Sequence, residues 1–204
     1  MDYRTAIEET FLGRAFLRPL FYSYPGGLRF ALSEGGHAID QFLTAHQKAA
    51  EICRDLFPCD GHLTICLQAY HFQESKFAYR SALRDLATVG IKIPQLRSIW
   101  LEEVAEESSL FVAFSASNAL LPRLLWCALA ADFGSIRPRA QCTVYLFNLD
   151  TSVMALPYDD RGMDVVGPNP SLLEKLYRKH SAYLLEHDRE AMRASFEQSS
   201  RIQS

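Results

Sequence analysis

The sequence lacks the short motifs that identify the common catalytic and nucleotide-binding sites. It contains no Gly-x-Ser-x-Gly string, so it gives no indication of a nucleophile-elbow hydrolase. The glycine pairs Gly26-Gly27 and Gly35-Gly36 do not have the spacing of loops that cradle phosphates in P-loop or dinucleotide-binding proteins. Neither serine-based hydrolysis nor nucleotide binding through these loops is therefore indicated.

Paired cysteines, excess positive charge and long apolar runs are also missing. The five cysteines form an odd number without Cys-x-x-Cys spacing, which favours reduced, buried thiols over disulfides or a zinc site. A formal net charge of −3 disfavours general nucleic-acid binding. The most apolar stretch, Ala119 to Phe133, is shorter than the about 18 to 20 residues that cross a bilayer, and the first residues do not resemble a secretory signal. We therefore expect a cytoplasmic protein with no membrane segment, metal or cofactor.

The apolar residues predict an α+β fold, with a mixed, mostly antiparallel sheet or sheets and helices packed on them. The length of 204 residues suits a single domain spanning residues 1–204. Strands are predicted at Leu20 to Tyr24, Leu28 to Ser33, Leu63 to Tyr70, Ser98 to Val104, Leu110 to Ser115, Cys142 to Leu149, Ser152 to Tyr158 and Met163 to Val166. Helices are predicted at Ile7 to Phe16, Ile39 to Phe57, Ser75 to Thr88 and Leu120 to Ala131, after an N-cap at Ser171, and at His187 to Phe196.

The order of these elements raises the question of an internal duplication. Residues 19–70 and 97–150 both read as strand, strand, helix, strand, which would make two related ββαβ units. A hairpin and C-terminal helices, residues 151–198, would follow them. Apolar strands resemble one another by default, so the alternative is two similar but unrelated segments.

The strongest cluster of polar residues lies around Asp159, Asp160 and Asp164. Three carboxylates so close in sequence can bind a divalent cation, or can act as acid and base with His187 as a proton carrier. The structural alternative is a turn formed by Asp159, Asp160, Arg161 and Gly162, because aspartate bonds its own backbone in turns and glycine accepts the positive φ that such turns need.

A second group of charges lies at the predicted hairpin near residue 105. Glu102, Glu103, Glu106 and Glu107 concentrate negative charge there. They either keep an edge strand from aggregating or form a docking face for a protein partner.

Several strings resemble those of one bacterial family. They are Tyr158 to Val165, Leu173 to Tyr177, His187 to Glu190, and Leu28-Arg29-Phe30. Together they make the chain similar to the family called domain of unknown function 3885. The resemblance implies a bacterial, stand-alone protein of this size, and no catalytic residue is carried over from it.

Two hypotheses for function follow. The first is a non-catalytic protein-binding module, such as a cytoplasmic immunity or antitoxin-like protein that neutralises a toxin. The alternative is a small metal-dependent hydrolase or nuclease-like enzyme that uses Asp159, Asp160 and Asp164. The strand order, the oligomeric state and the identity of the partner do not follow from the sequence.

Overall fold

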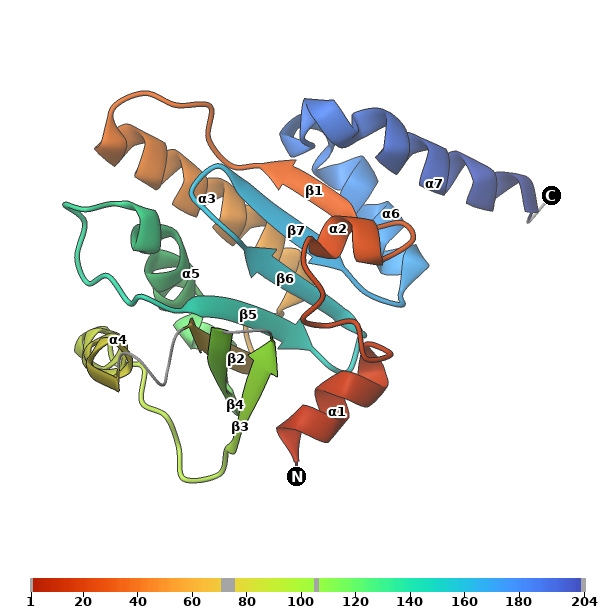
Figure 1. Ribbon diagram of the computed structural model, residues 1–204. Coiled ribbons are helices and arrows are strands. Elements are labelled where there is room, and N and C mark those ends of the chain that lie inside the picture. The colour runs from red at the N-terminus through yellow and green to blue at the C-terminus, as the bar shows by residue number, and fades with distance from the viewer. Residues whose placement is uncertain (1, 71–75, 105–106, 203–204) are drawn as a thin grey trace.

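A computed structural model of the chain shows one seven-stranded antiparallel sheet with helices on both faces (Figure 1). The structure describes residues 2–70, 76–104 and 107–202, and for residues 76–79, 104, 107 and 197–202 it describes the backbone alone. The α+β class with an antiparallel sheet predicted from the sequence is confirmed.

The strands follow the order β1-β7-β6-β5-β2-β4-β3 across the sheet. Their bounds are β1 Leu28–Ala31, β2 His62–Tyr70, β3 Ser98–Val104, β4 Glu107–Ser117, β5 Thr143–Asn148, β6 Val153–Pro157 and β7 Gly162–Val166. The α-helices are α1 Tyr3–Thr10, α2 Leu20–Ser23, α3 Ala38–Leu56, α4 Lys76–Thr88, α5 Leu121–Leu129, α6 Pro170–Lys179 and α7 Arg189–Ile202, with short 3-10 turns at Asn118–Leu120, Ala130–Asp132, Ser181–Tyr183 and Glu186–Asp188.

The central strands are apolar on both faces because a core lies on each side of the sheet. On β2, Leu63, Ile65 and Leu67 point into the larger core, whereas Cys66 points into the smaller one. This alternation follows from the two-residue period of a strand. A strand buried on both faces therefore appears in the sequence as a mostly apolar run, as β2 does apart from the buried Thr64 and Gln68.

The two cores are covered by different helices. The larger core holds side chains of α3 and α5, which pack against each other behind the sheet (Figure 1). The smaller core is closed by Tyr3 and Ile7 of α1, by Phe11 and by Leu20 at the start of α2. The N-terminal segment thus lies on the opposite face of the sheet from α3 and α5.

The two edges of the sheet differ. At the β1 edge, the main chain near Leu184 forms a bridge to Phe30, and Leu185 N–H donates to Arg29 O at 2.9 Å. At the other edge, no strand within the described residues pairs with the outer side of β3. One edge is therefore covered by the chain itself, and the other is open.

Two predictions for the N-terminal segment were wrong. Leu20 to Tyr24 forms helix α2 instead of a strand, since a run this short has too few residues for its period to separate one helical turn from a strand. The first helix lies at Tyr3–Thr10, where the Asp2 carboxylate accepts a hydrogen bond from Arg4 N–H and begins the helix earlier than predicted.

The helix after Pro170 also begins earlier than predicted. Asn169, and not Ser171, is its N-cap, because the Asn169 side chain accepts a hydrogen bond from Leu172 N–H at 3.1 Å.

The two segments proposed as repeats begin with different secondary-structure elements. Residues 19–70 contain α2, β1, α3 and β2, whereas residues 97–150 contain β3, β4, α5 and β5 together with 3-10 turns. Strand β3 pairs with β4, but β1 pairs with β7. The duplication stays a prediction, and its first copy would have a helix where the second has a strand.

Among the described helices, none is both long enough and apolar enough to cross a membrane.

Candidate functional site

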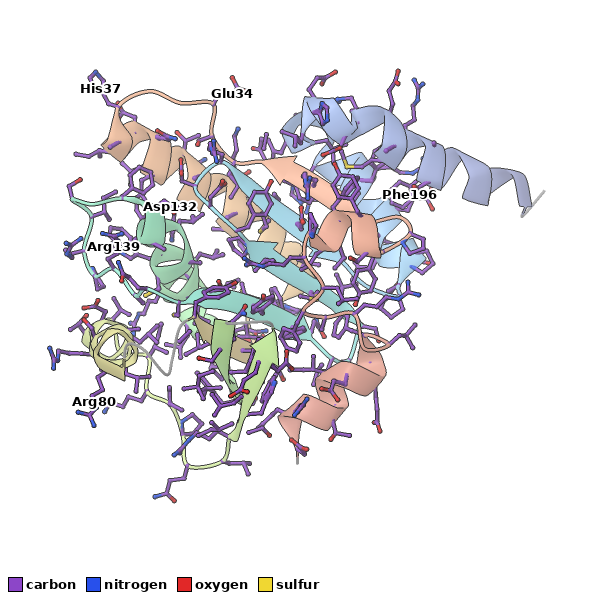
Figure 2. The ribbon with its side chains drawn as sticks, in the orientation of Figure 1. Glu34, His37, Arg80, Asp132, Arg139 and Phe196 are labelled. Carbon is purple, nitrogen blue, oxygen red and sulfur yellow. The ribbon has the colours of Figure 1, made fainter. Side chains whose placement is uncertain are left out.

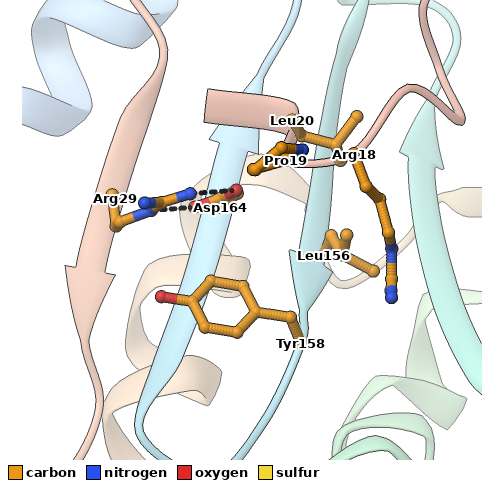
Figure 3. A pocket seen from close by; sticks show the side chains of 7 residues that line it. All are labelled: Arg18, Pro19, Leu20, Arg29, Leu156, Tyr158 and Asp164. Carbon is orange, nitrogen blue, oxygen red and sulfur yellow. Dashed lines mark hydrogen bonds and ion pairs between the residues drawn. The ribbon is translucent and has the colours of Figure 1, made fainter. Parts of the chain in front are cut away.

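An ion pair at the β1 end of the sheet forms the centre of the candidate site. Asp164 and Arg29 occupy paired positions on β7 and β1. Arg29 donates from Nε to Asp164 Oδ1 at 2.8 Å and from a terminal nitrogen to Oδ2 at 3.1 Å (Figure 3). The Asp164 carboxylate is almost completely buried and also accepts a hydrogen bond from Phe21 N–H at 3.1 Å. Such full pairing is what makes a buried carboxylate tolerable.

Arg29 also contacts a second carboxylate, from the C-terminal part of the chain. Asp188 lies in the 3-10 turn Glu186–Asp188, and its Oδ2 is 3.3 Å from an Arg29 terminal nitrogen. Asp188 Oδ1 accepts a hydrogen bond from the Tyr22 hydroxyl at 3.1 Å. Arg29 therefore joins α2, β7 and the C-terminal segment in one network.

Aromatic rings surround the Arg29 guanidinium. Its central carbon lies 4.9 Å from the ring centre of Phe21, 5.1 Å from that of Tyr22 and 5.6 Å from that of Tyr158. Hydrogen bonding to Asp164 raises the pKa of Arg29 above its ordinary value, although burial acts against this. The cation is fixed in place and stays charged at every physiological pH.

A pocket of about 380 Å³ opens beside this pair (Figure 3). Its lining residues are Arg18, Pro19, Leu20, Arg29, Leu156, Tyr158 and Asp164. We call it the Arg29 pocket. Most of its wall is hydrocarbon, so it favours an apolar group, while the two arginines and the tyrosine hydroxyl offer polar contacts at defined points.

The two arginines of the pocket differ in their surroundings. Arg29 is already paired with carboxylates, whereas Arg18 has no ion pair with any acidic residue in the described part of the chain. The Arg18 guanidinium carbon lies 5.7 Å from the centre of the Tyr145 ring, and the side chain is exposed. Arg18 is thus the charge of this pocket that is available to a ligand.

Tyr158 forms one wall, and Gly162 makes room for it. Burial, together with the nearby Asp164 carboxylate, raises the pKa of Tyr158 to about 12, so the hydroxyl keeps its proton. A Cβ at position 162 would lie only 1.9 Å from the Tyr158 hydroxyl oxygen. Gly162 does not have the positive φ that the sequence suggested. The glycine is required by the close approach of this ring.

A second pocket, of about 440 Å³, lies on the other side of Tyr158. Tyr70, Thr143 and Asp132 are among its lining residues. Burial raises the pKa of Asp132, and the negative charges of Asp159 and Asp160 add to that effect. Figure 2 shows Asp132 and Arg139 near the end of α5, where the chain leaves the helix toward β5.

Asp159 and Arg161 lie at the predicted turn. The Asp159 carboxylate accepts hydrogen bonds from the N–H groups of Arg161 and Gly162, both at 2.8 Å. The exposed Arg161 guanidinium bonds the same carboxylate at 2.9 Å. These contacts close the turn between β6 and β7 by the local mechanism expected for aspartate.

Asp160 has a different set of partners. Its main-chain oxygen accepts a hydrogen bond from Ser33 Oγ at 2.9 Å, and its carboxylate accepts one from Gln41 Nε2 on α3. Asp160 is buried and faces α3, whereas Asp164 faces α2 on the opposite side of the sheet. The turn is therefore attached to the loop after β1 and to α3.

The three aspartates thus have separate partners and do not share a site. Among the described residues, no group of three or more His, Cys, Asp or Glu side chains is placed to hold a metal ion. His187 is exposed, and its neighbour Asp188 is the residue that reaches the network. The catalytic assignment of Asp159, Asp160, Asp164 and His187 stays a prediction that this geometry does not support.

Two glutamates of the second hairpin, Glu102 and Glu103, lie on opposite faces of β3. Glu102 accepts a hydrogen bond from Trp100 Nε1 at 3.0 Å and lies 3.7 Å from the Arg4 guanidinium of α1. Glu103, the next residue of the strand, faces the other side. Glu106 lies outside the described residues, and only the backbone of Glu107 is described, at the start of β4. Glu102 is thus turned toward α1 and away from the face of Glu103, and the partner-binding role of Glu102, Glu103, Glu106 and Glu107 stays a prediction.

Sequence reasoning missed Arg18, Arg29 and Asp188 as site residues. A signal for one of them was present, because Arg29 interrupts the apolar run of its strand. The strings that carry the family resemblance contain Arg29, Asp164 and Asp188, which are the three charges that meet in the fold.

A family model described as "Domain of unknown function (DUF3885)" matches residues 3–188. The match covers most of the chain and confirms the family predicted from those strings. No curated protein and no solved structure gives a significant match to the chain.

Proposed function

The chain belongs to the DUF3885 family, and we propose that it is a non-catalytic module that binds another protein at the Arg29 pocket. The observation that carries this proposal is the contrast between the two arginines of the pocket. Arg29 is held by Asp164 and Asp188, whereas Arg18 has no acidic partner among the described residues. A partner can supply the missing negative charge.

The rim of the pocket has the composition of a protein interface. Leu17 and Tyr22, from the same segment as Arg18, are large side chains with exposed fractions of 54% and 64%. Tyr158 is partly exposed as well. Tyrosine and arginine beside apolar pockets are the residue types that contribute most binding energy in protein complexes.

This arrangement specifies the group that the partner contributes. We expect an acidic side chain that pairs with Arg18, next to an apolar residue that enters the pocket against Pro19 and Leu156. The charge pair would fix the orientation of the complex, and the apolar contact would supply most of the affinity.

For the identity of the partner, we propose a toxin encoded by a neighbouring gene in a bacterium. The chain would then act in the cytoplasm as an immunity or antitoxin-like protein. The strings that resemble a bacterial family and the exposed Arg18 beside an apolar pocket, which suits contact with an acidic partner, support this choice.

The test is co-expression with the products of the adjacent genes, followed by purification and calorimetric titration of any complex. We expect Arg18→Glu to weaken binding by at least about tenfold, since it replaces an attractive charge pair with a repulsive one. Arg84→Glu, the same change at an exposed position of α4, is the matched control and should leave the affinity unchanged.

Two results would overturn the proposal. One is that none of the adjacent products binds at micromolar concentrations. The other is a complex whose affinity is the same with Arg18→Glu as with the control, which would place the contact elsewhere on the molecule.

A further inference from the structure

We infer that the open edge of β3 pairs with the same edge of a second copy of this chain. Two seven-stranded sheets would then form one continuous sheet across a two-fold axis. This surface lies at the opposite end of the strand order from β1, whose Arg29 belongs to the Arg29 pocket. The inference therefore does not depend on the proposed function.

In the described part of the chain, one edge of the sheet is covered by the chain itself, and the other is not. The β1 edge is covered by the main chain near Leu184, but the outer side of β3 has no strand partner within the described residues. The main-chain N–H and C=O groups along an open edge form hydrogen bonds readily with another strand.

Two apolar side chains on this edge strand are exposed. Ile99 and Leu101 lie on the same face of β3, and 53% and 49% of their surfaces are exposed. Their neighbour Trp100, on the opposite face, is covered by Arg4 of α1. The apolar surface is thus confined to the face that α1 leaves uncovered.

The edge of β3 is complementary to the same edge of a second copy in one antiparallel register. In an antiparallel pair centred on Trp100, Ile99 of each copy lies opposite Leu101 of the other, so this apolar pair forms twice. In the same register Arg97 lies opposite Glu103, and Ser98 lies opposite Glu102. No like charges face each other.

Antiparallel pairs of β3 that are centred on other residues place less compatible side chains opposite each other. If the pair is centred on Glu102, the two Glu102 side chains lie directly opposite, which is destabilising. If it is centred on Leu101, Ile99 lies opposite Glu103. The register centred on Trp100 is the one that matches apolar residues with apolar residues and cation with anion.

The first test measures the mass of the full chain by sedimentation or light scattering. We expect a dimer at about 100 µM protein, since edge pairing alone gives a modest interface. Leu101→Lys should give a monomer. Leu43→Lys, at an exposed leucine of α3, is the matched control and should stay dimeric.

The second test checks the register by charge exchange at two exposed positions, so it does not depend on whether Leu101→Lys folds. Arg97→Glu and Glu103→Arg should each weaken self-association by about tenfold or more, because each places like charges opposite each other twice. An equimolar mixture of these two variants should form a heterodimer, in which both pairs are again opposite in sign.

Different experimental outcomes would overturn the proposed dimer and its proposed register. A wild-type monomer at about 100 µM, or a dimer that survives Leu101→Lys, overturns the inference. A mixture of the two charge variants that does not associate overturns the register. All these measurements use the chain alone, so they are independent of any partner at the Arg29 pocket.

Discussion

Arg29 and Asp164 face each other on β1 and β7 and are joined by two parallel hydrogen bonds of 2.8 and 3.1 Å. The carboxylate is buried, so its only compensation comes from protein donors. We predict that Arg29→Met lowers the free energy of unfolding by about 3–5 kcal/mol, because it leaves a buried charge without its partner. Urea denaturation followed by circular dichroism measures this loss.

The double variant Arg29→Met/Asp164→Leu is the informative control for that prediction. It removes both charges and should recover a large part of the lost stability. Arg161→Ala, which breaks the exposed pair with Asp159, should cost far less stability than Arg29→Met, because solvent screens an exposed ion pair. If Arg29→Met and Arg161→Ala lower the free energy of unfolding equally, the buried Arg29–Asp164 pair contributes no more to stability than the exposed pair.

Gly162→Ala should be destabilising by about 1–3 kcal/mol because the added methyl overlaps the Tyr158 ring. Gly134→Ala is the matched control, since a Cβ there meets no atom within 4 Å and its φ is not positive. The double variant Gly162→Ala/Tyr158→Ala should show a smaller effect of the methyl than Gly162→Ala alone. A methyl effect of the same size with and without the ring would show that Tyr158 is not the cause. Thermal unfolding of the wild type, Gly162→Ala, Tyr158→Ala, their double variant and Gly134→Ala provides the comparison.

Asp132→Asn is expected to stabilise the protein at neutral pH. Burial and the charges of Asp159 and Asp160 raise the Asp132 pKa above 3.8, so folding opposes its ionisation. The resulting penalty appears as the pH rises through the interval between 3.8 and the higher pKa of the folded protein, and it is absent below that interval. The gain should stay below about 1 kcal/mol because the side chain is exposed enough for solvent to screen it. Melting temperatures between acid and neutral pH measure it, and a gain that persists at low pH would contradict the assignment.

Calorimetry with Mg²⁺, Mn²⁺ and Zn²⁺ tests the alternative of a metal-dependent hydrolase. We expect no saturable binding, since Asp159, Asp160 and Asp164 each accept hydrogen bonds from a different part of the fold. Asp160→Asn should instead lower stability by about 1–2 kcal/mol, because it weakens the hydrogen bonds that the Asp160 carboxylate accepts from Gln41 Nε2 and Ser33 Oγ. Saturable metal binding that this variant abolishes would favour the enzyme.

The features that the sequence predicted well depend on residues close together in the chain. The Asp159 turn needs only Arg161 and Gly162, and the buried strand β2 appears as a run of mostly apolar residues. Patterns of this length contain enough information to place a turn or a buried strand. The segment at Leu20 was misread because four residues do not define a period.

The features that the sequence could not predict depend on contacts between distant residues. Arg29 is separated from Asp164 and Asp188 by most of the chain, and nothing local to Arg29 identifies these two partners. The role of Gly162 was misassigned for a related reason, since it depends on where the Tyr158 ring lies and not on the backbone angle of the glycine. Pairing of this kind becomes visible once the strand order is known.

The strand order also determines when the sheet can be completed during synthesis. Strand β1 leaves the ribosome early, but its neighbour β7 and the covering main chain near Leu184 are made much later. At typical rates of translation this interval is on the order of ten seconds. Throughout it, Leu28 and Phe30 have no strand to pair with, so the nascent chain exposes an apolar segment that a chaperone can bind. A fragment that ends before β7 would keep that segment exposed permanently.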